Sequence, residues 1–489
     1  MFAVTAAQMR EIDRTGCALV GGIRLMERAA EALCAEILSR YGRSAAVSAV
    51  CGGGNNGGDG LYAAVLLKEA GCRVQICLCG EPRTEDAKEM YSRAKAAGIP
   101  FSEELGRPDV IVDALVGTGF HGTLRERAAY WVDRINESGA AVVAADCPTG
   151  IDSDDGSCEK AVCAEVTVTF HRPKPGLYSY PGRALCGEIV VADIGMPGEA
   201  EQNIRFETEI AGRDSALMML PPRRADSNKG NFGTAVIAGG SQGMCGSITL
   251  AAAGALRAGA GKVLVAAPEE TLPVLAVKLT EAMQTPLRTA EELLSLPASV
   301  LALGCGLRTG AWQRELVVEV IERAKVPLIL DADALNCIAA APEVFKRAKA
   351  PVLLTPHPGE MARLCGITAE EVQRNRLALA KEFAARYGVT VLLKGAGSIT
   401  AAPDGRACLN TSGGPALAKG GSGDLLCGMA AGFAAQGMPL FTSAARAAYY
   451  HGLAGDRVAQ RYGSYAVLAT DVAAELPCVL RAAEMEWTV

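Results

Sequence analysis

Short apolar segments rich in β-branched residues alternate along the first half of the chain with longer Ala-rich segments. The short segments are apolar almost throughout, which is typical of parallel strands buried on both faces. We expect strands at 45–50, 73–78, 110–112 and 141–145. The intervening segments predict helices at 58–69, 85–97 and 125–136. Strands that alternate with helices predict an α/β fold with a doubly wound sheet.

The pattern changes after Cys163 and then restarts. Strands at 165–170 and 187–191, joined by a Pro/Gly-rich segment, should close a first unit near Pro197, before a polar connector at 198–224. Further strands are expected at 234–238, 263–266, 300–303, 328–330, 352–354 and 389–393. We therefore predict two domains, 1–205 and 214–489.

Composition excludes several classes of protein. Half of the 489 residues are hydrophobic and 21% are charged, which is ample for a core and unlike a disordered chain. The net charge of -6, without a basic stripe, argues against a nucleic-acid partner. The apolar stretches are too short or too interrupted for the ~20 residues of a membrane span, so no membrane partner is expected.

The 17 cysteines include no CxxC pair, which argues against zinc ribbons and thioredoxin-type centres. The four histidines are too scattered to suggest a metal cage. Because the chain is long and its start lacks a secretory pattern, we expect reduced cysteines in a cytoplasmic protein.

The sequence CGGGNNGGDG, from Cys51 to Gly60, lies between a predicted strand and a predicted helix. Such a glycine-rich turn lets backbone N–H groups approach a phosphate at the positive end of the helix. A tight turn is the alternative, since Asn-Gly and Asp-Gly are common turn pairs. The motif is not GxGxxG, which argues against an NAD-dependent dehydrogenase.

Acids follow two further strands: Asp113 in DALVGTGFHGT and Asp146 in DCPTGID. Carboxyl ends of parallel strands line the ligand crevice, so Asn56, Asp113 and Thr149 should converge there. Oxygen ligands of low total charge suit a monovalent cation. Each Asp could instead cap a helix. Lys174, in HRPKPGL, could face an anionic ligand beside this crevice.

In the second half, GGSGD at 420–424 opens a predicted helix of small and apolar residues. Bare helix N–H groups form an anion hole for a transferring phosphoryl group, and Asp424 could act as base on a substrate hydroxyl. A capping Asp is the alternative. LLKGAGS, with Lys394, follows a strand and could contact a nucleotide, and TPHPGE places His357 beside another strand end. Asp331 and Asp333 follow a third strand. They could belong to the site, or they could cap the helix that follows.

Taken together, these motifs resemble the bifunctional NAD(P)H-hydrate repair enzyme family over nearly the whole chain. NNGGDG, DALVGTGFHGT, DCPTGID and FHRPKPGL are similar to the epimerase pattern, in the family's order. NKGNFG, GGS, TPHPGE, LLKGAGS and GGSGD are similar to the dehydratase. The resemblance implies a Rossmann-like doubly wound domain followed by a ribokinase-like α/β domain.

The resemblance also implies the chemistry. The first domain would interconvert the R and S forms of hydrated NADH and NADPH (NADHX and NADPHX). The second would use ADP, with Mg²⁺, to phosphorylate the hydroxyl of the S form, and elimination would restore NAD(P)H with release of AMP and phosphate. We also expect a homo-oligomer.

Site residues follow from the same resemblance, with Asp146 and Asp424 as the catalytic residues. The epimerase substrate residues would be Asn55, Asn56, Gly57, Gly58, Asp59, Gly117, Thr118, Gly119, Phe120, His121, Gly122, Thr123 and Asp146. Potassium would be held by Asn56, Asp113 and Thr149. The dehydratase substrate residues would be Ser247, Gly306, His357 and Asp424, and the nucleotide residues Lys394, Gly395, Ala396, Gly397, Ser398 and Gly423.

The chain departs from the family pattern at a few positions. Ser247 replaces a residue of a Gly-Ala-Pro-like run, and the GCGL sequence at Gly304 replaces a Gly-Pro-Gly-like turn. Thr149 stands where the family usually has Ser, and Lys419 stands where Thr is common. The Thr149 exchange keeps the hydroxyl.

Two other functions remain open from the sequence. A ribokinase-type vitamin-precursor kinase would share the GGSGD anion hole but would release a stable phosphorylated alcohol. A ligand-sensing protein that has lost activity would have damaged catalytic positions, whereas Asp146 and Asp424 are both present.

Overall fold

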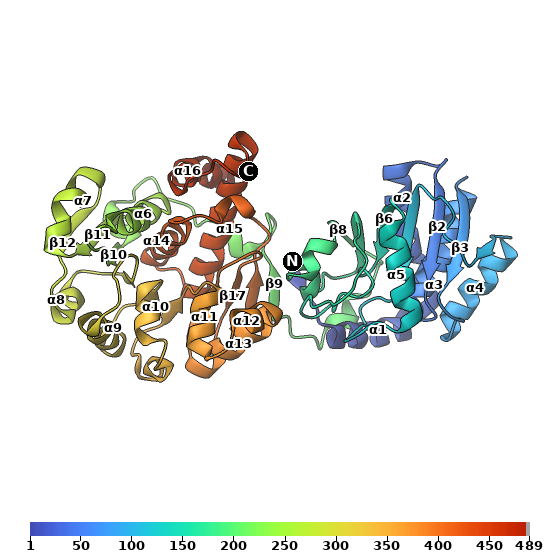
Figure 1. Ribbon diagram of the computed structural model, residues 1–489, viewed down its shortest axis with the longest axis horizontal. Helices are drawn as coiled ribbons and strands as arrows, with labels where there is room; N and C mark the ends of the chain where they lie inside the picture. Colours follow the sequence, from blue (N-terminus) through green and yellow to red (C-terminus); the bar gives the residue numbers. More distant parts are fainter. Residues whose placement is uncertain (486–489) are drawn as a thin grey trace. The chain divides into compact units, whose positions relative to one another are not determined.

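The computed structural model describes residues 1–485, which divide into two compact units, Phe2–Thr208 and 209 onward (Figure 1). Each unit has its own sheet and its own hydrophobic core. The expected polar connector contains a short strand, β9 (Thr208–Ile210), which lies beside β18 (Ala407–Leu409) in the second sheet. Within the described residues, no helix is both long enough and apolar enough to cross a membrane.

The sheet of the first unit is parallel throughout, in the order β4-β3-β2-β5-β6-β7-β8. Its strands are β2 (Ala46–Cys51), β3 (Arg73–Leu78), β4 (Phe101–Ser102), β5 (Val110–Ala114), β6 (Ala141–Ala145), β7 (Val166–Phe170) and β8 (Glu188–Ala192). The six strands expected here are confirmed to within two residues. The chain runs from β2 outward to β3 and then returns to the other side of β2 with β5. The strand order therefore reverses between β2 and β5, where α/β sheets bind their ligands.

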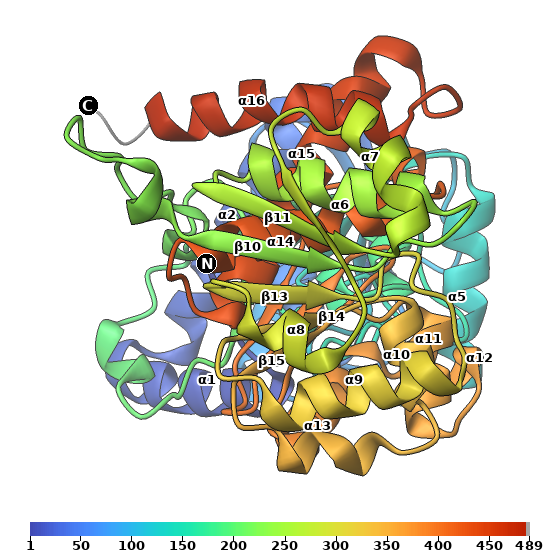
Figure 2. The ribbon, with the colours of Figure 1, turned by 90° about the vertical axis from the view of Figure 1, so that its left-hand side faces the viewer.

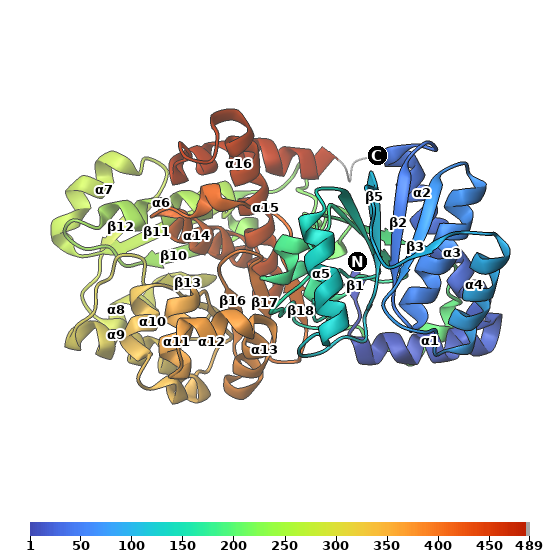
Figure 3. The same ribbon diagram turned by 45° about the vertical axis from the view of Figure 1, so that its right-hand side comes forward.

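Helices cover both faces of this sheet (Figure 3). They are α1 (Ala6–Val20), α2 (Gly22–Tyr41), α3 (Asn55–Glu69), α4 (Glu85–Ala96) and α5 (Glu126–Glu137). Val110 and Val112 belong to the core formed with α2 and α3, while Ile111 packs with Trp131 and Val132 of α5. Successive side chains of a strand point to opposite faces, so a continuous apolar segment is what a sheet covered on both faces requires.

From residue 208 onward, the strands of the second sheet have the order β9-β18-β17-β16-β15-β14-β13-β10-β11-β12. Its remaining strands are β10 (Thr234–Ala238), β11 (Lys262–Ala267), β12 (Met283–Pro286), β13 (Val300–Leu303), β14 (Leu328–Leu330), β15 (Val352–Leu354), β16 (Thr390–Leu393) and β17 (Ile399–Ala401). From β12 to β16 all pairs are parallel, and β17 and β18 add antiparallel strands. The six strands expected here are confirmed, but β12, β17 and β18 were not predicted.

Two groups of helices cover this sheet (Figures 1 and 2). On one side lie α6 (Cys245–Arg257), α14 (Ser422–Ala435), α15 (Leu440–Tyr462) and α16 (Ala469–Met485). On the other lie α8 (Ala290–Ser295), α9 (Ala311–Arg323), α10 (Asp333–Ile338), α11 (Pro358–Cys365), α12 (Ala369–Arg374) and α13 (Arg376–Tyr387). The remaining helix, α7 (Leu272–Lys278), packs against β12 and α6.

The small residues of α14 allow it to pack unusually close to α6. A Cβ at Gly428 would lie 1.8 Å from the carbonyl oxygen of Ala251, and a Cβ at Gly254 would lie 2.3 Å from that of Leu425. Any larger side chain would push the two backbones apart. This contact therefore fixes the beginning of α14, where GGSGD lies.

Two candidate active sites

A cavity of about 400 Å³ opens at the carboxyl ends of β2, β5 and β6, at the point where the strand order reverses. The glycine-rich loop after β2 and the loop after β5 contribute to its lining. Helix α1 adds Arg10 and Asp13, and Lys174 comes from the segment after β7. The cavity lies where a sheet of this kind is expected to bind a ligand.

Helix α3 begins at Asn55, three residues earlier than predicted. A Cβ at Gly57 would lie 1.8 Å from the carbonyl oxygen of Gly52, so only glycine permits this close turn. The preceding Gly54 provides no side-chain cap. The first-turn N–H groups of α3 are therefore left for an anion, as the glycine-rich motif predicts.

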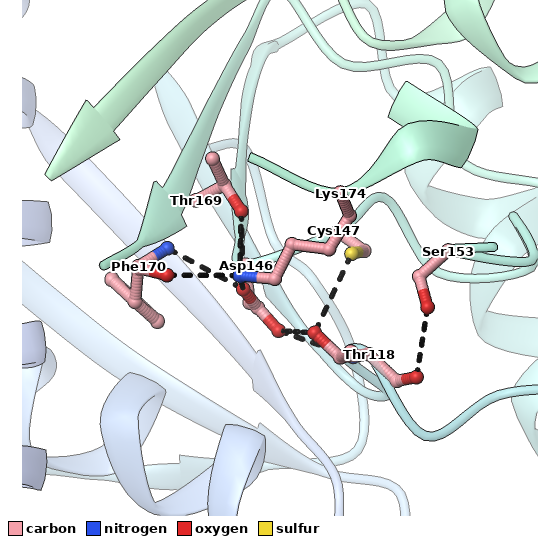
Figure 4. Close-up of polar contacts among 7 residues, drawn as sticks. All are labelled: Thr118, Asp146, Cys147, Ser153, Thr169, Phe170 and Lys174. Carbon is pink, nitrogen blue, oxygen red and sulfur yellow. Dashed lines mark hydrogen bonds and ion pairs between the residues drawn. The ribbon is translucent and has the colours of Figure 1, made fainter. Parts of the chain in front are cut away.

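Asp146 is the centre of a buried polar cluster (Figure 4). Its Oδ1 accepts from the Lys174 ammonium at 2.6 Å and from the Thr169 hydroxyl at 3.2 Å. Its Oδ2 accepts from the hydroxyl of Thr118 and, at 3.1 Å, from the backbone N–H of that residue. Lys174 itself is only 1% exposed and donates also to Thr169 and to the Phe170 carbonyl. The lysine that the sequence placed beside the crevice is thus a fixed part of the cluster.

The cluster keeps Asp146 ionised. Burial alone would raise the pKa of its carboxyl, but Lys174 and the Thr118 hydrogen bonds outweigh burial and hold the pKa below its usual value. An ionised carboxylate that faces a cavity can accept a proton from a bound substrate.

Two other acids of the cavity behave in the opposite way. Burial, with a contribution from Asp146, raises the pKa of Asp13 to about 6 and that of Asp59 well above its usual value. The cavity therefore combines one ionised carboxylate with two carboxyls that hold protons more readily. Such separated pKa values are how one site supplies both a base and an acid. Asp13 was missed by the sequence analysis, because nothing in the pattern of α1 distinguishes it.

Two of the predicted cation ligands, Asp113 and Thr149, contact each other, and the third, Asn56, lines the cavity. Asp113 is fully buried and accepts from the Thr149 hydroxyl at 2.7 Å and the Thr149 backbone N–H at 2.8 Å. The two terminal atoms of the Asn56 amide lie 3.1 Å from the Ala145 carbonyl oxygen and 3.3 Å from the Gly117 amide nitrogen. Asp113 and Thr149 therefore meet directly, while Asn56, in the first turn of α3, contacts the backbone of Ala145 and Gly117.

This donor set fits a monovalent cation. Within residues 1–485, the hydrogen bonds to Asp113 come from uncharged groups, those of Thr149 and the Leu115 N–H. A buried carboxylate without a cationic side chain is costly unless a cation balances its charge. The single formal charge among the three residues suits a monovalent better than a divalent ion.

Several residues expected to bind the epimerase substrate lie outside the lining of this cavity. Gly57 and Gly58 are buried in the turn, and Gly58 packs against Met26. The segment from Phe120 to Thr123 follows the lining loop. His121 pairs with Asp152 at 2.6 Å. Asn55, Asn56, Asp59, Gly117, Thr118, Gly119 and Asp146 do line the cavity.

The second candidate site surrounds the start of α14. Gly421 caps the helix with a φ of 93°, a conformation that favours glycine. Asp424, in the first turn, hydrogen-bonds with the Ser247 hydroxyl and the Cys305 thiol. A Cβ at Gly306 would lie 3.2 Å from the Cβ of Ser247. Three of the four residues expected to bind the dehydratase substrate, Ser247, Gly306 and Asp424, are thus brought together.

Lys394 connects this group to the acids of the neighbouring strand ends. Its ammonium lies 2.6 Å from Asp331 Oδ1 and 4.0 Å from Glu360, and a Cβ at Gly423 would lie 3.3 Å from it. Burial would lower the pKa of Lys394, but the two carboxylates outweigh it and raise the pKa. Burial raises the pKa of Asp424, with a further contribution from Asp331. Asp331 is therefore an ion-pair partner of Lys394. The sequence alone had left its role open, with helix capping as the alternative.

The remaining predicted residues are connected to this site through neighbours of Lys394. The backbone of 395–398 is supported by Arg376, a residue that the sequence analysis missed, which donates to the carbonyls of Lys394 and Gly397 at 3.3 Å. His357 caps α11: its Nδ1 accepts from the Gly359 N–H at 3.0 Å. It contacts Glu360 and so reaches Lys394 only indirectly.

Comparison with known proteins decides the family. Residues 22–176 match the family model described as YjeF-related protein N-terminus, and residues 235–478 match the model of NAD(P)H-hydrate dehydratase. The bifunctional NAD(P)H-hydrate repair enzyme Nnr of Moorella thermoacetica is 39% identical over 99% of this chain and 98% of its own length. This chain belongs to the bifunctional NAD(P)H-hydrate repair enzyme family.

Other members of the repair enzyme family agree. The enzyme of that name from Escherichia coli is 35% identical over 92% of this chain and 87% of its own length. The crystal structure of the ADP/ATP-dependent NAD(P)H-hydrate dehydratase from Bacillus subtilis, co-crystallised with ATP/Mg²⁺, is 33% identical, with a TM-score of 0.52. It covers 58% of this chain and all of its own. As a member of the repair enzyme family, the chain is neither a dehydrogenase nor a vitamin-precursor kinase with an unrelated first domain.

Proposed function

We propose that this chain repairs hydrated NADH and NADPH in two steps at two separate sites. The first unit epimerises the R and S hydrates, and the second dehydrates the S form with ADP. The observation that carries the proposal is the presence of a complete acid–base cluster in each unit, around Asp146 and around Asp424, in a chain related to the repair enzymes along its whole length. Incubation with mixed NADH hydrates and ADP, followed by absorbance of the reduced cofactor, tests it.

Epimerisation requires a proton to leave one group and another proton to arrive. We propose that ionised Asp146 accepts a proton from the hydrate, oriented by Lys174 and Thr118. Protonated Asp13, which lines the same cavity, would donate the proton that arrives. The N–H groups at the start of α3 would bind a cofactor phosphate.

Asp13 should give the epimerase a specific pH dependence. The charged or titratable groups that face Asp13 are Asp146, Lys174 and Asp59. Because the pKa of Asp13 is about 6, its protonated fraction falls as pH rises through that value. We expect Asp13→Asn to slow epimerisation by about 10²-fold and to remove the decline above pH 6. Rates of R/S interconversion from pH 5 to 8 test this. A variant that keeps the wild-type decline, with Asp59→Asn losing it, would assign the acid to Asp59.

For the dehydratase, we propose that Asp424 accepts the proton of the substrate hydroxyl as its oxygen attacks the β-phosphorus of ADP. The bond from phosphorus to the AMP oxygen breaks, and AMP leaves. The N–H groups at the start of α14 and the Lys394 ammonium would stabilise the transferring phosphoryl group. Phosphate then leaves the ring with its oxygen, the adjacent ring carbon loses a proton to solvent, and the electrons of that C–H bond restore the nicotinamide double bond. Ser247 holds the Asp424 carboxylate in position.

Mg²⁺ would enter this site with the nucleotide; the Bacillus subtilis dehydratase was co-crystallised with ATP/Mg²⁺. The ion commonly binds through substrate phosphates and water rather than through a protein cage. Asp331 and Glu360 supply nearby negative charge, already shared with Lys394.

We propose that the first unit binds potassium through Asn56, Asp113 and Thr149. When bound, the ion would supply positive charge beside the acidic cavity and lower the repulsion of an anionic cofactor. The residues themselves hold the strand-end loops together, through Asp113 and Thr149.

Potassium dependence tests this assignment. We expect the wild-type epimerase rate to rise with potassium at constant ionic strength, and Asp113→Ala to lose both that rise and affinity for the hydrate, since the charge that balances the cation is gone. Thr149→Ser keeps the hydroxyl and should keep the dependence. Asp113→Asn, which preserves volume, covers the case in which the Ala variant does not fold. A wild-type rate that ignores potassium would contradict the site.

A cytoplasmic location and a homo-oligomeric state are further proposals. All 17 cysteines are free, which is consistent with a reducing compartment. Tyr465 and Leu468, between α15 and α16, are 96% and 55% exposed and could take part in a contact between copies. Light scattering of the purified protein measures the mass of the assembly.

A further inference from the structure

Two cysteines and an aspartate meet beside the base of the second site. The Sγ atoms of Cys305 and Cys427 and a carboxylate oxygen of Asp331 all lie within 4.8 Å of one another. Cys305 follows β13, Asp331 follows β14, and Cys427 is in the second turn of α14. All three are at most 2% exposed.

The two sulfur atoms and one oxygen of Asp331 face one another. Asp331 uses Oδ1 to bind Lys394, and its Oδ2 lies 3.9 Å from Cys305 Sγ. The Cys305 thiol hydrogen-bonds with Cys427 and with Asp424. One oxygen of Asp331 and the two sulfurs therefore surround one point, and the Asp424 carboxylate lies next to it on the side of Cys305. The mechanism proposed for the dehydratase uses neither thiol.

The spacing agrees with tetrahedral coordination. At a zinc–sulfur distance of about 2.3 Å and a zinc–oxygen distance of about 2.0–2.2 Å, ligand atoms around one ion lie about 3.5–3.8 Å apart. The 3.9 Å between Cys305 Sγ and Asp331 Oδ2 is close to this value. Two thiolates select soft or borderline ions over Mg²⁺, which prefers oxygen ligands.

We propose that Cys305, Cys427 and Asp331 form a site for Zn²⁺ or a similar thiophilic divalent ion, and that an ion bound there inhibits the dehydratase. Binding forms two metal–sulfur bonds and one metal–oxygen bond to the protein, a water molecule completes the coordination, and the two thiol protons leave to solvent. No electron transfer is involved. The proposal rests on the proposed function of Asp424, because the positive ion would lie beside the carboxylate that accepts the substrate proton and would make it a weaker base.

The bifunctional chain supplies its own control. Zn²⁺ at this site would stop dehydration while epimerisation in the first unit continues. The epimerase rate in the same sample therefore reports on general denaturation or non-specific binding to the other cysteines. A failure of the dehydratase itself, without any metal, would instead contradict the proposed function.

The test uses the full-length protein, reduced with a phosphine and titrated with Zn²⁺ in the presence of Mg²⁺ and ADP. We expect loss of dehydration at about one Zn²⁺ per chain and recovery with a zinc-selective chelator. Removing a residue that only supports a metal ligand costs about 10–100-fold in affinity. We therefore expect Cys305→Ala and Cys427→Ala each to weaken inhibition by about 100-fold, each compared with its own metal-free rate.

A spectroscopic measurement makes the result independent of activity. Co²⁺ in place of Zn²⁺ should give a thiolate-to-cobalt charge-transfer band that Cys305→Ala/Cys427→Ala lacks. Cys408→Ala, which removes a buried thiol on β18, should keep both the band and the inhibition. Cys→Ser variants, judged by epimerase rate and thermal unfolding, replace any Ala variant that does not fold.

Three results would overturn the proposal. One is a cobalt band of equal strength in the double variant, which would place the metal on other cysteines. Another is inhibition of the variants at the same Zn²⁺ concentration as the wild type. The third is inhibition that a thiol reductant reverses and the chelator does not, which would indicate a disulfide between Cys305 and Cys427.

Discussion

Substitution of Asp424 by Asn should abolish ADP-dependent recovery of NADH and leave interconversion of the R and S hydrates intact. Asp424 lies in the first turn of α14, where it hydrogen-bonds with Ser247 and where the ammonium of Lys394 approaches Gly423. An amide retains this geometry but cannot accept the hydroxyl proton. Loss of a general base typically costs about 10²–10⁴ in rate, and we expect an effect in that range on dehydration.

Chromatographic separation of the two hydrates, with and without ADP, measures both activities in one sample. Asp404→Asn is a matched control, since that carboxylate lies half-exposed in the same unit and pairs with Arg406. We expect it to be without effect. Near-normal recovery of reduced cofactor by Asp424→Asn would mean that Asp424 only caps the helix.

Substitution of Asp146 by Asn should remove epimerisation by a similar factor of about 10²–10⁴ while leaving dehydration of the S hydrate unchanged. The variant loses the ionised group of the cavity and also leaves Lys174, which is 1% exposed, without its charge partner. Removing one partner of a buried ion pair costs about 3–5 kcal/mol, so the first unit should also unfold at lower temperature.

Asp146→Asn has a distinct signature with a mixture of hydrates. The S fraction should be recovered at the wild-type rate, after which the reaction should stop with the R hydrate unused. Asp146→Asn/Lys174→Met, which removes the unpaired charge, should regain stability but not activity. Asp133→Asn, at an exposed ion pair on α5, is the control. Complete recovery of both hydrates by Asp146→Asn would exclude Asp146 as the base, provided that spontaneous interconversion is slower.

Catalysis and stability can be separated in these experiments because each unit reports on the other. A variant that unfolds the first unit should lose epimerase activity together with its thermal transition. A variant that only lacks a base should keep the transition. The same comparison applies to the metal experiment on Cys305 and Cys427.

The sequence by itself determined the order of the strands along the chain and the position of most functional loops. Strands such as β6, β13 and β14 were predicted at their observed bounds, because a strand buried on both faces is apolar at nearly every position. The glycines of 51–60 and 420–424 also predicted close turns at two helix starts, since such a turn leaves few alternatives to glycine. Resemblance to a family then attached chemistry to these loops.

Only the tertiary structure decided what each loop meets. The beginning of α3 was placed three residues late, because Asn and Gly are as common in turns as in a helix start that binds an anion. β12, β17 and β18 contain three or four residues and, unlike the equally short β14 and β15, are not runs of large aliphatic side chains. Their strand geometry comes from pairing with neighbours distant in sequence.

The same reason separates the predicted from the unpredicted site residues. Asp146 stands directly after β6 and Asp113 is the second-last residue of β5, so the apolar pattern of each strand predicts the position of its acid. Asp13, Arg376 and Cys427 lie within helices, and no local signal marks their functional neighbours. Their roles depend on contacts between segments far apart in the chain, which arise only when helices and sheet pack together. Sequence periodicity reports which face of an element is buried, whereas the packed structure decides which side chains share that buried space.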